Sequence, residues 1–260
     1  DVIAGVATCM QPVQGIGNSA GQIGGKAVSV GHDGQARIFD LRPQAEVRTI
    51  HVGIKLDSIA VSPDGKSLLT GMNVPQGLNR PRRYDVLTGD LLADWDAHAT
   101  SIESAAISPD GSLYATASRY NEIQVCGANG EVVYRTTSKS RNESLAFFNS
   151  NHHIAALIRG PARTDSLKIW DLASGQTSDL PFDFDTNSFA CSTPNAGKSS
   201  SLIAAASSDT ISVVRWPSGE TVLEEQQVVG RIRCVDISSN GEIIAAGCEE
   251  GTVYVWNLTR

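Results

Sequence analysis

Six stretches with similar endings recur at nearly equal intervals along the whole chain. Taking the aspartate that closes the clearest of them as a marker, successive markers are 45, 42, 44, 44 and 42 residues apart. Regular self-similarity at this period is typical of repeat architectures, in which each unit packs on its neighbours. The marker positions are Asp40, Asp85, Gly127, Asp171, Arg215 and Asn257.

Each unit also follows the same internal pattern. Four short apolar runs are separated by tight polar turns, and the last unit shows the first three of them in RCVDIS, SNG, EIIAAGC, EEG and TVYVWN. Valine, isoleucine and alanine dominate the runs, and glycine, asparagine, aspartate and serine occupy the turns, which is the pattern of consecutive hairpins. Four strands in 42 to 45 residues predict an all-β fold, a β-propeller of four-stranded blades with six blades visible.

Several motifs within these units narrow the family. They are Ser62-Pro-Asp-Gly65, Ser108-Pro-Asp-Gly111, Leu167-Lys-Ile-Trp-Asp-Leu172, Gly251-Thr-Val-Tyr-Val-Trp-Asn257 and the pair Ala97-His98. With these motifs the chain resembles the WD40-repeat β-propeller family over all six units. The resemblance implies one propeller domain over residues 1–260, either alone or within a longer protein, that binds other proteins as a subunit or domain of a complex.

The chain departs from the family pattern in two ways. Tryptophan ends the third strand only at Trp170 and Trp256, and a histidine stands at the family's place clearly only at His98, with His51 one residue away. The buried network of histidine, serine or threonine, aspartate and tryptophan that the family resemblance implies is therefore expected to be mostly absent. We expect His98 itself to be a structural hydrogen-bonding residue.

Closure of the ring is left open by the sequence. The sixth unit stops at Arg260 without a fourth strand, and an exposed sheet edge must be protected. Residues Val2–Val6 could supply that strand. If residues 2–9 instead form the first strand of the first blade, the resemblance implies either a seventh blade missing upstream or an open six-bladed ring closed by a strand from a partner.

Two short motifs resemble nucleotide-binding loops but lack the required context. Gly197-Lys198-Ser199 ends like a P-loop, yet Ser192 stands where the first glycine is needed and no helix follows. The glycine-rich stretch at 15–25 is followed by the strand-like KAVSVGH, whereas a dinucleotide fingerprint needs a helix there. We interpret both as loops between strands, and we expect no cofactor.

Composition sets further limits. A net charge of −7 and a pI of about 5.2 disfavour a general nucleic-acid binder. The five cysteines are odd in number and form no C-x-x-C pair, which favours a reduced, intracellular and cytoplasmic protein without a zinc site. No apolar run is long enough to span a membrane. No small-molecule substrate is indicated.

Basic residues gather in the loops of three consecutive blades. The loops before the first strand and between the second and third strands share one end of a propeller, here called the upper rim. On this rim, the loops of the second to fourth blades are basic. The loops of the fifth and sixth blades are acidic, through Asp183, Asp185, Asp209 and the pairs Glu224-Glu225 and Glu249-Glu250. The predicted binding residues, here called the arginine patch, are Arg80, Arg82, Arg83, Arg119, Lys139, Arg141, Arg159 and Arg163.

Arg83 is the most unusual member of the arginine patch. Its slot in the third strand holds an aliphatic residue in the other five units, namely Ile38, Val125, Ile169, Val213 and Val255. A residue that breaks a repeated local rule can mark a functional site. The alternative is a shift of register caused by the long loop that precedes it.

These observations support three functional hypotheses. The first is a non-enzymatic scaffold for protein interactions whose arginines bind an acidic or phosphorylated segment, because the planar guanidinium matches carboxylate and phosphate groups. The second is a propeller enzyme, a hydrolase or lyase, with a site at the mouth of the channel. The third is a binder of acidic lipid head groups or nucleic acid, whose affinity would fall steeply with salt.

Overall fold

The computed structural model confirms an all-β fold. It describes residues 3–12, 23–31, 33–40, 47–53, 55–72, 79–95, 98, 100–120, 122–137, 141–148, 151–159, 166–180, 182, 186–192, 200–238 and 240–258. Within these ranges every regular element is a strand. The described residues contain no helix long and apolar enough to span a membrane. The chain divides into two compact units, Asp1–Thr137 and Ser138–Arg260.

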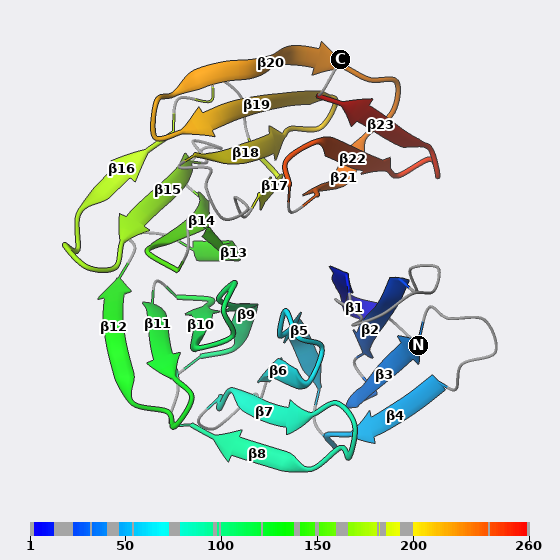
Figure 1. Cartoon of the computed structure of the whole chain (residues 1–260), viewed down its shortest axis with the longest axis vertical. Coiled ribbons are helices and arrows are strands. Elements are labelled where there is room, and N and C mark those ends of the chain that lie inside the picture. Colours follow the sequence, from blue (N-terminus) through cyan, green and yellow to red (C-terminus); the bar gives the residue numbers. More distant parts are fainter. Residues whose placement is uncertain are drawn as a thin grey trace, which may run out of the picture. The chain divides into compact units, whose positions relative to one another are not determined.

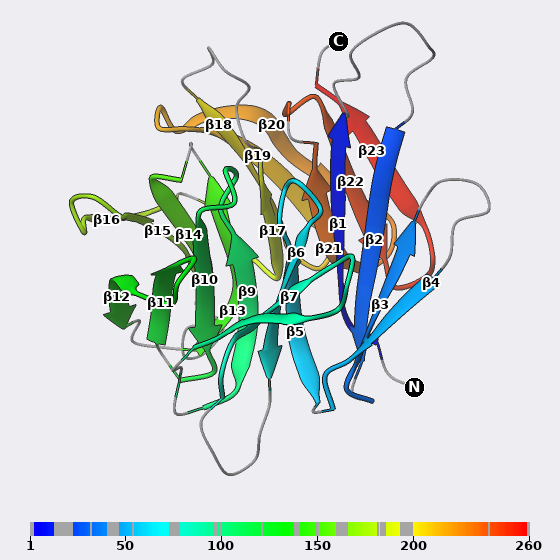
Figure 2. The same ribbon diagram turned by 60° about the horizontal axis from the view of Figure 1, so that its bottom comes forward.

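Unit 1 contains three four-stranded antiparallel sheets, each ordered from its first strand to its fourth. Figure 1 shows that the first strands, β1, β5 and β9, lie innermost in this unit and the fourth strands outermost. Figure 2 shows β5 and β9 side by side, in agreement with their contact. The strands are β1 (Ile3–Pro12), β2 (Ile23–Gly31), β3 (Gln35–Asp40), β4 (Val47–His51), β5 (Leu56–Val61), β6 (Ser67–Met72), β7 (Arg82–Asp85), β8 (Leu91–Asp94), β9 (Ile102–Ile107), β10 (Leu113–Ser118), β11 (Glu122–Gly127) and β12 (Val132–Thr137).

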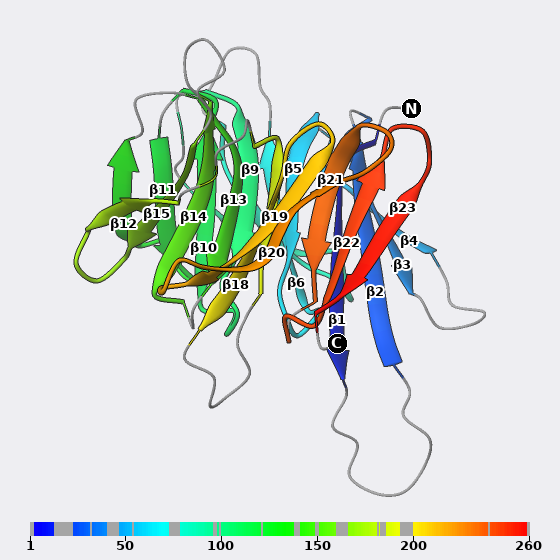
Figure 3. The ribbon, with the colours of Figure 1, turned by 90° about the horizontal axis from the view of Figure 1, so that it is seen from above.

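Unit 2 contains two further four-stranded sheets and one of three strands. In Figure 3 its strands run up and down between two ends, and turns join neighbouring strands at those ends. The strands are β13 (Arg141–Phe148), β14 (His153–Arg159), β15 (Ser166–Asp171), β16 (Thr177–Asp179), β17 (Ser188–Cys191), β18 (Ser201–Ala206), β19 (Thr210–Trp216), β20 (Glu220–Gln227), β21 (Ile232–Ile237), β22 (Ile243–Cys248) and β23 (Val253–Asn257).

Burial explains the residue types of the strands. The second strand of a sheet is covered on both faces, so β18, with the sequence SLIAAA, is buried at every position. Alternating burial in β5, with the sequence LDSIAV, reflects a strand covered mainly on one face. In unit 2, one cluster of buried residues joins β18 and β19 to β21 and β22, which shows that side chains of neighbouring sheets interdigitate within the unit.

The turns between the first and second strands are fixed by their own side chains. In the Ser-Pro-Asp-Gly turn of the second sheet, the Ser62 hydroxyl donates to Asp64 at 2.6 Å and accepts the backbone N–H of Ser67 at 2.8 Å. The same pair of bonds recurs at Ser108, where the oxygen–oxygen distance to Asp110 is 2.7 Å. The glycine that ends the turn has a positive φ, 69° at Gly65. Local chemistry therefore specifies these hairpins.

The strand register confirms the alignment of the repeats. In each sheet, the residue before the marker pairs with a second-strand residue at one fixed position of the repeat. The residue at the Arg83 position pairs with the neighbouring second-strand residue. Arg83 lies opposite Leu69, at the same position of the repeat as Val125 opposite Ala115 and Val213 opposite Ala204. The alternative of a shifted register at Arg83 is therefore wrong.

The regions with nucleotide-loop motifs are flanked by strands. β17 and β18 pair antiparallel on either side of the Gly197-Lys198-Ser199 segment, which identifies the connection as a hairpin. Residues 193–199 themselves lie outside the described residues, as do 13–22 of the glycine-rich stretch. The expected strand after that stretch is confirmed as β2.

The N-terminal strand belongs to the first sheet. β1 pairs with β2, so Val2–Val6 does not replace the fourth strand of the last sheet, which has the order β21-β22-β23 in the described residues. The number of blades and the closure of the ring stay predictions.

Candidate binding site

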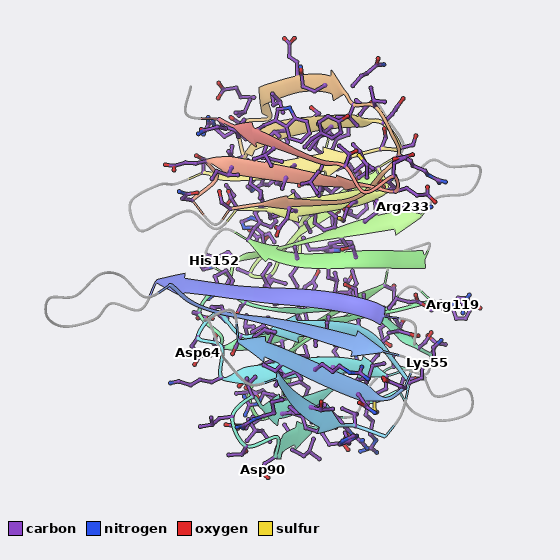
Figure 4. All side chains as sticks on the ribbon, turned by 90° about the vertical axis from the view of Figure 1, so that its right-hand side faces the viewer. Lys55, Asp64, Asp90, Arg119, His152 and Arg233 are labelled. Atoms are coloured by element: carbon purple, nitrogen blue, oxygen red, sulfur yellow. The ribbon has the colours of Figure 1, made fainter. Side chains whose placement is uncertain are left out.

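Within unit 1, two basic residues mark the upper rim. Figure 4 shows Lys55 and Arg119 at one end of the sheets and Asp64 at the opposite end. Lys55 precedes β5, Arg119 follows β10, and Asp64 lies in the turn between β5 and β6. The expected assignment of loops to the two ends is confirmed at these positions.

Arg80 and Arg82 share one carboxylate. Asp94, at the end of β8, lies opposite Arg82 in the register of β7 and β8. The Arg82 Nε is 3.3 Å from Asp94 Oδ2, and the Arg80 Nη1 is 3.8 Å from Asp94 Oδ1. Arg82 and Arg83 belong to β7 itself, in agreement with the third-strand slot predicted for Arg83.

Arg119 is the most exposed of the described arginines of the patch. Its Nε lies 3.8 Å from Glu103 Oε1, and its side chain is 47% exposed. A pair that is this open to solvent is worth little to stability, because water screens it. Arg119 is therefore free to exchange Glu103 for another acid at small cost.

Arg83 points between two sheets. Its Nη1 donates a hydrogen bond to the Tyr114 hydroxyl at 2.8 Å, and its guanidinium carbon lies 5.2 Å from the centre of the Tyr114 ring. Tyr114 belongs to β10 of the third sheet and is buried. The half-buried Arg83 thus bridges the second and third sheets through a hydrogen bond and a cation–π contact.

The four remaining residues of the arginine patch belong to unit 2. Arg141 and Arg159 are backbone partners at one end of the β13–β14 pair, and nothing further is described of their side chains. Lys139 and Arg163 lie outside the described residues. Arg80, Arg82 and Arg83 thus lie at or within β7 of the second sheet, and Arg119 follows β10 of the third sheet. Their role in one binding site, like that of the other four residues, stays a prediction.

The acidic residues of unit 2 are partly occupied by partners of their own. Glu249 is 2.7 Å from Arg233 Nη2, and this ion pair lowers the pKa of Glu249. The Glu250 carboxylate accepts the backbone N–H of Arg231 at 3.1 Å. Among the described residues no three of histidine, cysteine, aspartate and glutamate form a group suited to a metal ion.

His98 has the structural role that the sequence predicted. The ring is fully buried, its Nδ1 is 2.9 Å from a Glu122 oxygen, and its Nε2 is 2.8 Å from the Thr116 hydroxyl. Because a carboxylate can only accept, Nδ1 carries the proton and Nε2 accepts from Thr116. Arg135 Nε lies 3.2 Å from the other Glu122 oxygen. Burial lowers the pKa of His98, so the ring is neutral at pH 7.

Sequence reasoning missed the residues around His98. The family pattern places aspartate and tryptophan in this network, whereas the chain uses Glu122 and Arg135. The strand pairing of β11 with β12 brings Arg135 to Glu122, because Gln124 lies opposite Arg135. Only the strand register, which the sequence specifies weakly for β12, could have revealed that contact.

The sheets and their connections define a class of protein. Consecutive four-stranded antiparallel sheets, each ordered from an inner first strand to an outer fourth strand, are the blades of a β-propeller, a rigid framework whose loops are available for binding.

One family model matches two stretches of the chain. The model of the WD domain, G-beta repeat, matches residues 89–125 and 222–257, which span β8 to β11 and most of β20 through β23. Each match runs from the fourth strand of one sheet through the first three of the next. These two stretches of the chain therefore match the WD40 repeat.

Two curated proteins are similar to the chain. "Apoptotic protease-activating factor 1" of Danio rerio is 25% identical over 179 residues, covering 66% of this chain and 13% of that protein. "Protein ROOT INITIATION DEFECTIVE 3" of Arabidopsis thaliana is 24% identical over 236 residues, covering 83% of this chain and 51% of that protein. The chain thus spans about half or less of the length of these relatives.

Proposed function

We propose that this chain is a non-enzymatic scaffold for protein interactions, which binds an acidic or phosphorylated segment of a partner at the arginine patch. WD40 repeats in general mediate contacts between proteins, which supports the scaffold role. The observation that supports the finer proposal is that Arg80, Arg82, Arg83 and Arg119 belong to two consecutive sheets, with Asp94 and Glu103 among their described partners, on a chain with a net charge of −7.

Arginine suits this role for a geometric reason. Its planar guanidinium meets a carboxylate or phosphate with two parallel hydrogen bonds, and it is more weakly hydrated than the lysine ammonium group. Neighbouring arginines on a rigid framework lose little conformational freedom when a segment binds across them. The acidic overall charge, in turn, disfavours long polyanions.

The test is affinity capture from native lysate followed by mass spectrometry. Wild type is compared with the triple variant Arg80→Glu, Arg82→Glu and Arg119→Glu, after circular dichroism shows that the variant is folded. We expect a small set of partners to be lost selectively, and to be released from wild type by a glutamate-rich competitor peptide. An unchanged list of partners would contradict the proposal.

A bound metal would favour the alternative of a propeller enzyme. Metal analysis of the purified protein addresses it directly, because a stoichiometric metal ion would point to catalysis at the channel mouth rather than to a scaffold.

A further inference from the structure

Two residues that break the repeat pattern meet each other. Arg83 occupies a slot that is aliphatic in the other five third strands. Tyr114 occupies a position of the second strand that holds Ala27, Leu68, Ile154, Ile203 and Ile244 in the other five sheets, as the strand register shows. The two exceptions lie on adjacent sheets of unit 1 and share a 2.8 Å hydrogen bond. A paired departure from an otherwise regular pattern indicates a specific role rather than drift.

Arg83 differs from the other described arginines of the patch in its charge balance. Arg80 and Arg82 face Asp94, and Arg119 faces Glu103. In the part of the chain that the structure describes, Arg83 has no carboxylate at ion-pair distance, and its hydrogen-bond partner is the neutral Tyr114 hydroxyl. A half-buried cation without a counter-charge is unfavourable in the free protein.

Two residues in contact with Tyr114 carry a hydrogen-bond donor that has no acceptor among the described residues. The Arg83 Nε and the Trp95 Nε1 are both buried and have no partner. The Trp95 ring lies 5.2 Å from the Tyr114 ring, at a tilt of 52°, and Trp95 is only 5% exposed. Arg83 reaches Tyr114 through its hydrogen bond, and Trp95 reaches it through the contact of the two rings. The cluster of Arg83, Trp95 and Tyr114 offers positive charge and donors but no acidic group.

We propose that Arg83, held in place by Tyr114, is the anchor of the arginine patch and binds the side-chain oxyanion of an acidic peptide. This inference rests on the proposed function and assigns its central contact. The tyrosine ring and hydroxyl fix the guanidinium before the peptide arrives, so little rotamer freedom is lost on binding. At Arg80, Arg82 and Arg119 an incoming acid must compete with Asp94 or Glu103, whereas at Arg83 it supplies the missing counter-charge.

The test uses residues 1–260 and three fluorescein-labelled peptides. The first alternates glutamate with glycine, the second replaces glutamate with phosphoserine, and the third replaces it with glutamine. Binding is followed by fluorescence anisotropy and, for the ¹⁵N-labelled protein, by the indole N–H signal of Trp95, assigned with Trp95→Phe. We expect the glutamate peptide, the phosphoserine peptide or both to bind and to shift the Trp95 signal, and the glutamine peptide to do neither. The two acidic peptides distinguish carboxylate from phosphate as the preferred oxyanion.

The key variant is Arg83→Ile, which restores the residue found at the slot in the first and fourth sheets. We expect it to weaken binding by at least about tenfold, the loss typical of a charged hydrogen bond. The matched control Arg215→Ile, which removes an arginine outside the patch that is paired with Glu220, should change binding by less than about twofold. Tyr114→Phe keeps the ring but removes the hydroxyl, and should weaken binding by an intermediate factor while the Trp95 signal still shifts.

Stability measurements separate this anchor from a purely structural clamp. The double variant Arg83→Ile with Tyr114→Phe leaves neither a lone cation nor an orphan hydroxyl, so we expect its urea midpoint to equal or exceed that of wild type while binding is lost. A lower midpoint together with unchanged peptide affinity would show a clamp and overturn the inference. So would the failure of both acidic peptides to bind wild type.

The inference and the proposed function fail in different ways. If the triple variant Arg80→Glu, Arg82→Glu and Arg119→Glu loses its partners while Arg83→Ile keeps them, the patch binds acids without the anchor, and only the inference is wrong. If neither variant loses a partner, both are wrong. If the single variant Arg83→Ile and the triple variant lose the same partners, the result supports both the inference and the proposed function.

Discussion

At the scale of single residues, His98 is the position where the chain depends most on one side chain. His98→Ala leaves the Thr116 hydroxyl and a Glu122 oxygen without their partner and opens space in the third sheet. We expect the free energy of unfolding, measured by urea denaturation, to fall by about 3 kcal/mol. His152→Ala is the matched control, because His152 is exposed in a turn. An equal loss in both variants would contradict the structural role of the His98 network.

The same residue gives a signed pH dependence. Burial lowers the pKa of His98 below its usual 6.5, although Glu122 opposes the shift. The unfolded chain therefore binds this proton more readily than the folded chain, and stability is lost as the pH falls below 6.5. We expect the unfolding free energy to decrease by up to about 1.4 kcal/mol per pH unit for this group between about pH 6.5 and 5.

The measurement compares wild type with His98→Gln by urea unfolding across that range. The variant should show a shallower decrease, because the titrating group is gone. Burial also lowers the pKa of His153, so some slope persists in the variant. Parallel curves for the two proteins would show that His98 does not contribute.

At the scale of elements, the turns between third and fourth strands test how tightly neighbouring sheets fit. Gly130 and Gly175 occupy equivalent turns and both have a positive φ, 84° and 70°. A Cβ at Gly130 would overlap the Trp95 indole of the adjacent sheet, whereas a Cβ at Gly175 meets nothing within 4 Å. Gly175→Ala should therefore cost about 1 kcal/mol of backbone strain, and Gly130→Ala about 3 kcal/mol.

Thermal unfolding of the two variants checks this difference. Equal midpoints would mean that the Trp95 indole moves aside without loss. Because Trp95 also lies in the proposed anion site, Gly130→Ala should in addition disturb the Trp95 indole signal, and Gly175→Ala should leave it unchanged.

The elements also show how far the sequence alone could lead. The repeat spacing, the Ser-Pro-Asp-Gly turns and the alternation of apolar residues are local signals, and they were sufficient for the sheets, their order and the slot of Arg83. The contacts of Arg83 with Tyr114 and of Arg82 with Asp94 were not predictable, because they depend on the packing of one sheet on the next and on the pairing of short outer strands. The network around His98 was only partly predictable, since Glu122 replaces the aspartate of the family pattern.

At the scale of the whole molecule, net charge separates the proposed scaffold from a binder of large polyanions. The chain carries a net charge of −7, and unit 2 contains the acidic residues Asp209, Glu224, Glu249 and Glu250. A nucleic-acid duplex or an anionic vesicle presents many negative charges over a wide area, so it would meet these acids as well as the arginines. A short acidic peptide can reach the arginines alone.

We therefore expect no measurable binding to duplex DNA or to phosphatidylserine vesicles at about 0.15 M salt, where the screening length is about 8 Å, under conditions in which the acidic peptide binds. Electrophoretic mobility shift and vesicle co-sedimentation provide the measurements, with the triple variant Arg80→Glu, Arg82→Glu and Arg119→Glu as the matched control. Salt dependence adds a second criterion, because the few contacts of a peptide give a shallow decrease of affinity with salt and a duplex gives a steep one. Strong, steeply salt-dependent binding to DNA or vesicles that the triple variant loses would favour a polyanion binder over the scaffold, because the arginines would then act through their summed charge rather than through the geometry of individual contacts.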